Sequence, residues 1–354
     1  TDRYIISSGI LVFNVFGLFG NLNVIYAHYR LPVLRTRYGI LLTLLCTSQS
    51  ICLLTELINA IYSLSKIPVI RSSCFLIISL GIFMHCAQTG LMASISVDLF
   101  ISIVFPLRHR VARTLPYLLL LCLPTLLYAF VVILIAILHM DSTRIHLCNP
   151  PYALPPIANQ FWYFVALCFG GLTIVTYIIS FSTIACKKKS RSVRDSKRSS
   201  SGIERKAMKS LSVLLVVFIV TRFLGTVMAN VMNLAGVDKE TVGMAQSYNV
   251  FSAMVCYSSS FYVCFFRSAE YRRIFWYQIT KVASRLGRSH KGKEVFLSSQ
   301  DSRWTSLDSH HRQLLRSTRR LAREGRGIPQ GLLCITYRRR STHSSLDYSL
   351  QYQL

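Results

Sequence analysis

The chain has 354 residues, of which 52% are hydrophobic and only 15% are charged, and its formal net charge is +26. A soluble domain of this size usually carries about 25% charged residues, so the composition predicts that lipid is the main solvent. The basic residues lie in connecting segments and in residues 267–354 rather than on the faces of soluble domains. This placement argues against a nucleic-acid partner and favours charge that sets membrane topology.

Seven apolar stretches are long enough to cross the bilayer, because a spanning helix needs roughly 20 mostly apolar residues. Unpaired backbone groups are not tolerated in lipid, so each stretch must be a helix or belong to a closed barrel. Barrel strands are about 10 residues long and alternate in polarity, unlike these stretches. We therefore predict an all-α seven-transmembrane helix bundle, with spans at about Tyr4–His28, Gly39–Ser65, Phe75–Val104, Tyr117–Leu138, Phe161–Ala185, Leu211–Leu234 and Ala245–Phe266.

The first apolar stretch does not have the pattern of a signal peptide. It is too long for a signal core and has no basic region ahead of it. The short segment before it fits a sequence that starts inside a longer precursor.

Charge in the connections predicts the orientation. Segments 29–38, 105–116 and 186–210 are basic, and the last holds ten Lys or Arg against two acidic residues, whereas the alternate connections are poor in basic residues. Positive loops stay in the cytoplasm. The sequence therefore predicts a multi-pass protein of the cell membrane with an extracellular N-terminus and a cytoplasmic C-terminus.

Three domains are predicted along the chain. Residues 1–266 form the bundle, and residues 267–286 place apolar side chains on one helical stripe with basic residues elsewhere, which is typical of a helix on the inner leaflet. The stripe consists of Tyr271, Ile274, Phe275, Ile279 and Val282. Residues 287–354 are rich in Ser, Arg, Gln and His and are expected to be a largely disordered basic tail.

Two charged residues lie within the predicted spans, Glu56 in the second and Arg222 in the sixth. Such residues are costly in lipid and usually face the bundle or a water-filled cavity. We expect both to point inward and to lie close enough to influence each other. They either fix packing, as an ion pair or with a neutral Glu56, or line a ligand pocket, for which His85 on the third span is a further candidate and a core histidine the alternative.

Seven of the eleven cysteines lie inside apolar runs, whereas Cys74 and Cys148 have different positions. Cys74 opens the third span and Asp98 closes it, about 36 Å away at 1.5 Å per residue. Cys148 lies on the same extracellular side as Cys74, where a disulfide can form and persist, so we expect these two to pair. Cys186, beside three lysines at the membrane edge, is a candidate for palmitoylation, with a plain free thiol as the alternative.

The sequence contains no glycine-rich phosphate loop, no His/Cys metal spacing and no nucleophile–base arrangement. We therefore expect no enzymatic activity, no cofactor and no metal site.

Six short motifs occur in a specific order and spacing. They are Gly20-Asn21, Cys74 with Cys148-Asn-Pro-Pro-Tyr-Ala-Leu, Ser96-Val-Asp98, Phe105-Pro-Leu-Arg108, Lys206-Ala-Met-Lys209-Ser-Leu and Phe266-Arg-Ser-Ala-Glu-Tyr-Arg-Arg273. With them, residues 5–280 resemble the rhodopsin-like (class A) G-protein-coupled receptors, and more closely the nematode serpentine chemoreceptors of class SX. The resemblance implies an extracellular ligand in the outer half of the bundle and a heterotrimeric G protein inside. Residues expected to face the G protein are Asp98, Leu99, Arg108, Lys206 and Lys209.

The chain departs from the receptor pattern at several positions. The arginine that follows Asp98 in the family is Leu99, the span-two acid is Gln49, and the aromatic switch of span six is Arg222. The span-seven motif reads Ser260-Phe-Tyr-Val-Cys264. These changes argue against a sodium site of the family type and predict weak G-protein coupling.

One further departure concerns the ligand. Gly81 stands where amine receptors carry an aspartate, which disfavours a biogenic amine ligand. Two alternatives to a signalling receptor remain: a non-signalling subunit or decoy, and a small-solute transporter. A transporter would show repeats or broken helices at matching positions, which the sequence lacks.

Overall fold

The computed structural model describes residues 2–31, 34–65, 68–145, 148–191, 212–237, 239–267, 271–272, 274–276 and 280. Residues 1–277 form one compact unit. The predicted tail, 287–354, and the two candidate contacts Lys206 and Lys209 lie outside the described residues.

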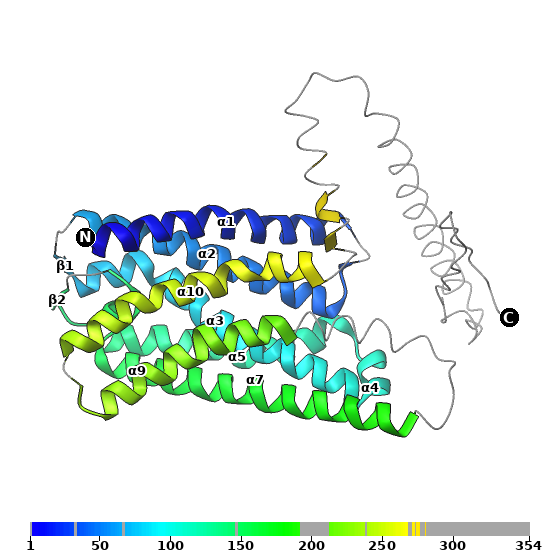
Figure 1. The fold of residues 1–354 in the computed structure, drawn as a ribbon. Helices are drawn as coiled ribbons and strands as arrows, with labels where there is room; N and C mark the ends of the chain where they lie inside the picture. Colours follow the sequence, from blue (N-terminus) through cyan, green and yellow to red (C-terminus); the bar gives the residue numbers. More distant parts are fainter. Residues whose placement is uncertain are drawn as a thin grey trace, which may run out of the picture. The chain divides into compact units, whose positions relative to one another are not determined.

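The described part of the chain folds as a bundle of long helices (Figure 1). Six of them are long and apolar enough to cross a membrane, and the shorter apolar helix Ser212–Met228 supplies the seventh crossing. This confirms the predicted seven-helix architecture. The long helices are α1 (Asp2–Arg30), α2 (Arg37–Ser65), α3 (Arg71–Val104), α5 (Thr114–Leu138), α7 (Pro156–Arg191) and α10 (Lys239–Arg267), and the sixth crossing continues through η2 (Ile219–Phe223) into α9 (Leu224–Leu234).

Helix α3 lies at the centre of the bundle. It packs on α2, α5 and α7, and 67% of its most apolar window is buried, against 22% for α7. Glycines allow these close approaches: a Cβ on Gly81 would come within 2.4 Å of Thr55 on α2, and one on Gly90 within 2.5 Å of Thr125 on α5. Small residues let helix backbones approach in this way, so a side chain at position 81 would force α2 and α3 apart.

Neutral hydrogen bonds join α1, α2 and α10, and two of them involve Gln49 and Ser260, where the sequence departs from the receptor pattern. Gln49 donates to the carbonyl of Cys256 at 3.3 Å and accepts from the hydroxyl of Ser260 at 2.8 Å. The amide of Asn21 donates to the carbonyl of Tyr257 at 3.0 Å. The polar groups of α2 and α10 therefore satisfy one another directly.

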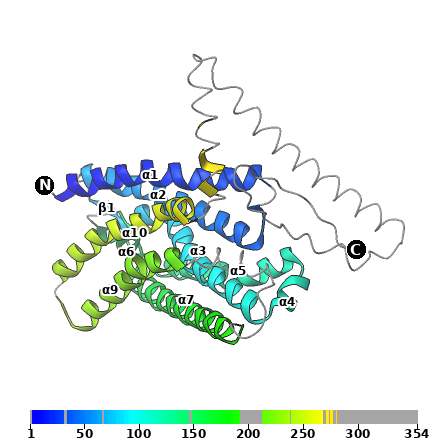
Figure 2. The ribbon, with the colours of Figure 1, turned by 45° about the vertical axis from the view of Figure 1, so that its right-hand side comes forward.

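One end of the bundle, here called the disulfide end, carries the Cys74–Cys148 bridge and the two-stranded sheet of β1 (Val69–Ile70) and β2 (Arg144–Ile145). The sheet is antiparallel, with Val69 opposite Ile145, and the Cα atoms of the bridge are 5.6 Å apart. The expected pairing of the two cysteines is confirmed. The N-terminus lies at this end in both ribbon views, and α4 (Pro106–Val111) lies at the opposite end (Figures 1 and 2).

An ion pair between Arg71 and Asp141 holds the loop beside the disulfide, and Arg71 Nε also donates to the carbonyl of Tyr152 at 3.1 Å. Slight desolvation favours the neutral acid, but hydrogen bonds from Thr143 and the Arg71 charge together hold the pKa of Asp141 below its ordinary value. The carboxylate therefore stays charged at neutral pH, and the loop keeps its tie to the start of α3.

The described residues of the predicted surface helix pack against the bundle. Phe275 is fully buried and Ile274 is 7% exposed, both in the cluster that includes Phe261. The hydroxyl of Tyr271 lies 2.9 Å from His28 Nε2 on α1. At these positions the apolar stripe packs against the protein, because Phe275 contacts the rings of Phe261 and Phe265 on α10. Ile279 and Val282 lie outside the described residues.

We expect replacement of Cys74 by alanine to reduce delivery of the protein to the cell surface. Losing a native disulfide typically costs about 2–5 kcal/mol of stability, and here it also releases the loop that holds Asn149 to Pro151 over the bundle. Flow cytometry with an N-terminal epitope tag measures the surface fraction. The free, exposed Cys168 is the control: Cys168→Ala should leave delivery unchanged, and an equal fall for both variants would contradict the role of the bridge.

Candidate functional site

A cavity opens between the helices at the disulfide end. Its walls come from α2, α3, α7, η2, α9 and α10, and the loop that follows Cys148 contributes Asn149, Pro150 and Pro151. The cavity volume is about 70 Å³. Since a single water needs roughly 10–15 Å³ of such space, the cavity holds a handful of waters or one compact small molecule. All three predicted pocket residues, Glu56, His85 and Arg222, line it.

Arg222 enters the cavity from an unusual stretch of helix. Residues Ile219–Phe223 form a π-helical turn, in which the N–H of Leu224 bonds the carbonyl of Ile219. Turns of this kind are rare and are frequent at functional sites. The extra residue shifts the register of the helix, so the half-buried guanidinium reaches α3 and α10 instead of lipid.

The guanidinium is held by aromatic partners. It contacts both ring nitrogens of His85, with Nδ1 at 3.3 Å, and lies 5.7 Å from the ring centroid of Tyr257. A guanidinium can only donate, so the ring nitrogen of His85 that faces it has to accept. The ring of Trp162 also packs against His85, tilted by 57°, with the ring centroids 5.0 Å apart. This packing fixes the cation in one place at the cavity wall.

Glu56 occupies the same cavity but is not directly paired with Arg222. The carboxylate is 7% exposed and accepts a hydrogen bond of 3.0 Å from Asn59, one turn further along α2. No direct ion pair joins these two described residues. The predicted inward placement of both charges is therefore correct, whereas contact between them is not formed, because each finds its nearest partner elsewhere.

Trp162 and Tyr257 are cavity residues that the sequence analysis did not single out. The indole N–H of Trp162 is buried and has no hydrogen-bond partner among the described residues, and the side chain is only 5% exposed. Aromatic residues are common in apolar spans, so the sequence alone does not separate these two from other aromatic residues. Only their position beside the charged residues Glu56 and Arg222 does so. A buried donor without a partner costs free energy, which marks this wall as one suited to a hydrogen-bond acceptor.

At the opposite end of the bundle, Asp98 has partners that the sequence analysis did not expect. It accepts from Tyr117 Oη at 2.9 Å and lies 3.0 Å from His109 Nε2, and only 6% of the residue is exposed. The basic residues Arg108 and Arg110 of the same segment, both described by the structure, form no ion pair with Asp98. Helix α4 directs His109 toward α3, while Arg108 is exposed and lies over Phe105 with the cation 6.0 Å from the ring centroid.

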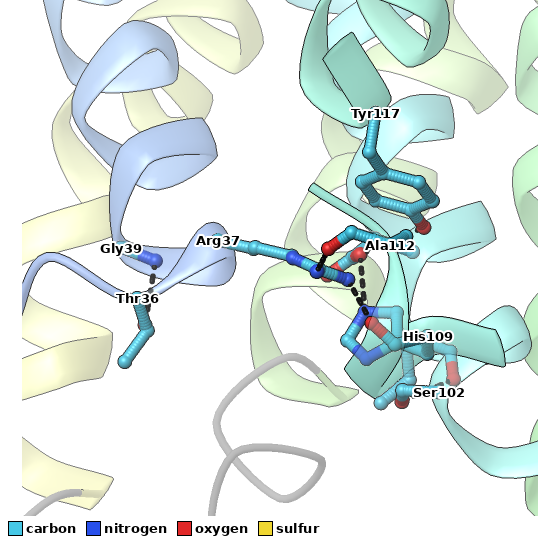
Figure 3. Close-up of polar contacts among 9 residues, drawn as sticks. Thr36, Arg37, Gly39, Ser102, His109, Ala112 and Tyr117 are labelled. Carbon is cyan, nitrogen blue, oxygen red and sulfur yellow. Dashed lines mark hydrogen bonds and ion pairs between the residues drawn. The ribbon is translucent and has the colours of Figure 1, made fainter. Parts of the chain in front are cut away.

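Arg37 connects α2 to this group. Its guanidinium donates to the carbonyls of His109 and Ala112 and lies 4.8 Å from the ring centroid of Tyr117. Figure 3 shows the side chain extending from the start of α2 to the backbone that follows α4. Asp98, His109, Tyr117 and Arg37, here called the Asp98 cluster, thus join α2, α3, α4 and α5. Charge alone pointed to Arg37 as a topological residue and gave no sign of these contacts.

The remaining predicted residues take different positions. Leu99 is partly buried and packs against the apolar cluster that includes Ile95 and Leu215. Cys186 is a free, exposed cysteine near the end of α7. The described part of the chain contains no group of three or more His, Cys, Asp or Glu that could hold a metal ion.

A comparison with known families gives one match, to the serpentine-type 7TM GPCR chemoreceptor Srsx, over residues 14–279. The chain belongs to the Srsx family of chemoreceptors. A search of curated proteins finds no match. The matched range includes six membrane crossings, the larger part of the first, the disulfide, the cavity and the Asp98 cluster. The family assignment therefore covers both candidate sites of this Srsx receptor. The family is one of chemoreceptors and not of enzymes.

In this Srsx receptor we expect Glu56→Gln and Arg222→Gln each to lower the melting temperature, and the double variant to cost less than their sum. The charges share a low-dielectric cavity, so either one alone loses an attraction across it. Coupled sites show interaction energies of about 0.5–3 kcal/mol, and the lower end applies here because the groups do not touch. Thermal unfolding of the detergent-purified receptor measures all four proteins.

The control cycle combines Arg222→Gln with Asp98→Asn. Asp98 lies 13 residues beyond His85 on α3, about 20 Å at 1.5 Å per residue, so these two changes should add. Strict additivity of the Glu56 and Arg222 changes as well would show that the two charges do not interact.

Removing one hydroxyl tests the Asp98 cluster. Tyr117→Phe should destabilise the Srsx receptor by about 1.5–3 kcal/mol, the usual range for a hydrogen bond to a charged group. Tyr29→Phe, at a side chain that is 72% exposed, is the matched control. Thermal unfolding that cannot distinguish the two variants would contradict a role for this hydrogen bond.

Proposed function

We propose that this Srsx chain is a receptor whose ligand binds in the cavity at the disulfide end and whose opposite end engages a heterotrimeric G protein, although weakly. The observation that carries the proposal is the cavity itself. Glu56, His85 and Arg222 come from three different helices and meet in a space that opens beside the disulfide-tethered loop. A pocket with a few convergent polar groups between helices is the usual form of a small-molecule site.

The disulfide end is proposed to face outside the cell, with the N-terminus. Support comes from the basic connections 29–38, 105–116 and 186–210, which positive-inside topology places in the cytoplasm, and from the bridge, which requires an oxidising side. In this orientation residues 1–266 form the bundle, 267–286 a helix at the inner leaflet and 287–354 a basic cytoplasmic tail. Cys186 then lies near the inner leaflet, where palmitoylation is feasible.

Helix α3 provides a physical connection between the two ends. His85 contacts Arg222 at the cavity, and Asp98, on the same helix, bonds α4 and α5 at the other end. A ligand that binds one packing of the bundle better than another shifts the population between them. Movement of α3 or of η2 would then change the surface formed by Asp98, Leu99 and Arg108, and by the segment that carries Lys206 and Lys209.

Weak coupling is proposed because Leu99 replaces the arginine of the receptor pattern. In the receptors it resembles, that arginine pairs with acids at rest and packs against the G protein when active. Leucine offers apolar contact but none of the five donors of a guanidinium. Phe261 and Cys264 on α10 are both buried, and they stand in the span-seven motif, which also departs from the receptor pattern. A poorer partner surface should lower basal activity, and a non-signalling subunit or decoy is the alternative that this position favours.

Second-messenger assays in cells that express the chain, screened against a chemically broad ligand panel, test the proposal. We expect low basal signalling, a weak ligand response and a stronger response from Leu99→Arg at equal surface expression. Leu99→Met keeps the apolar character and size and should behave as wild type.

A strong ligand response that Leu99→Arg leaves unchanged or reduces would contradict weak coupling. A ligand that binds the purified receptor while neither wild type nor Leu99→Arg signals would favour the non-signalling alternative.

A further inference from the structure

The cavity presents two opposite charges that are not in contact. Arg222 is held by His85 and Tyr257, and Glu56 by Asn59. Each of these partners is neutral, as the acceptor role of the His85 ring requires. Neither charge therefore has an oppositely charged partner in direct contact among the described residues. Burying a charge without such a partner is unfavourable unless other groups or a ligand compensate it.

A third group in the cavity wall also has an unmet requirement. Trp162 is only 5% exposed, and its indole N–H has no hydrogen-bond partner among the described residues. It packs against His85, which in turn contacts Arg222. Two donors, the indole N–H and the guanidinium, thus belong to the same cavity lining and both lie beside His85, whereas the Glu56 carboxylate is an acceptor when ionised.

From these groups we infer, on the basis of the ligand position proposed above, that the ligand is a compact zwitterion of the amino-acid class. Its carboxylate binds Arg222 and the indole N–H of Trp162, and its ammonium group binds Glu56. A ligand with one charge would satisfy one side of the cavity and leave the other ion unpaired. A simple amine is disfavoured for this reason, independently of Gly81, which packs against Thr55 and does not line the cavity.

The size of the cavity limits the ligand further. A cavity volume of about 70 Å³ is several times the roughly 10–15 Å³ that is needed to hold one water, so the space admits one compact molecule. Amino acids of about five to seven non-hydrogen atoms match this space, whereas a peptide of several residues does not. The suitable probes are glycine, 3-aminopropanoate and 4-aminobutanoate, which increase the separation of the two charges one carbon at a time.

The experiment measures binding to the full-length receptor in detergent by thermal stabilisation, at constant ionic strength. Each of the two longer amino acids is compared with the acid and the amine of the same chain length: propanoate and propylamine, butanoate and butylamine. We expect one amino acid of the series to bind at least about tenfold more tightly than either of its single-charge analogues. This comparison uses the wild-type chain, so it does not depend on whether a variant folds.

Two variants assign the charges. With Glu56→Gln the amino acid should lose its advantage over the acid but keep its advantage over the amine. With Arg222→Gln the amino acid should lose its advantage over the amine but keep its advantage over the acid. Arg144→Gln removes an exposed cation elsewhere at the disulfide end, outside the cavity lining, and should preserve the wild-type order of affinities.

The outcomes separate this inference from the proposed function. An acid or an amine that binds as tightly as its amino acid, or no binding by any probe, would overturn the zwitterion. Selective binding of an amino acid without a cellular signal would support the ligand class while contradicting signalling. A signal evoked only by neutral compounds or amines would support a signalling receptor and overturn the ligand class.

Discussion

A polar side chain inside the hydrocarbon layer can obtain hydrogen bonds only from other protein groups, from trapped water or from a bound ligand. This constraint shapes the whole bundle. Gln49 bonds Ser260 and the carbonyl of Cys256 between α2 and α10, and the amide of Asn21 on α1 donates to the carbonyl of Tyr257. Around the cavity the same requirement is met only in part, since the Trp162 indole has no partner among the described residues. Other buried polar atoms among the described residues also have no partner, including the side-chain oxygens of Asn21 and Gln88, but of these groups only Trp162 lines the cavity.

The central position of α3 makes it the natural link between the two ends. Its close contacts with α2 and α5 depend on glycines. Its polar side chains form contacts with other helices at a few separate positions along its length. His85 belongs to the cavity, Ser96 bonds Thr173 and Thr176 on α7, and Asp98 holds α4 and α5. A rigid helix in contact with so many neighbours cannot shift without changing several of these contacts. Two discrete packings are a better description of such a helix than gradual deformation.

The Asp98 cluster shows how the chain manages without the arginine of the receptor pattern. Asp98 would be costly if it were buried and unpaired, and Tyr117 and His109 supply its hydrogen bonds. Arg37 contributes from α2 by bonding the carbonyls at the end of α4 and lying over the Tyr117 ring. The tie therefore runs among α2, α3, α4 and α5 and does not include the sixth crossing. Movement of the sixth crossing, which carries Arg222, is correspondingly less restrained at this end by the described contacts.

The sequence by itself determined the number of crossings, their approximate limits and the disulfide, because span length, loop charge and cysteine placement follow from local composition and the thickness of the bilayer. It also predicted that Glu56, His85 and Arg222 face the interior, since a charge facing lipid is too costly. The tertiary structure alone decided which groups meet. The contacts of Arg222 with His85 depend on the π-helical turn, and those of Asp98 with His109 and Tyr117 depend on the path of α4. Both are set by helix register and long-range packing, which no local pattern in the chain specifies.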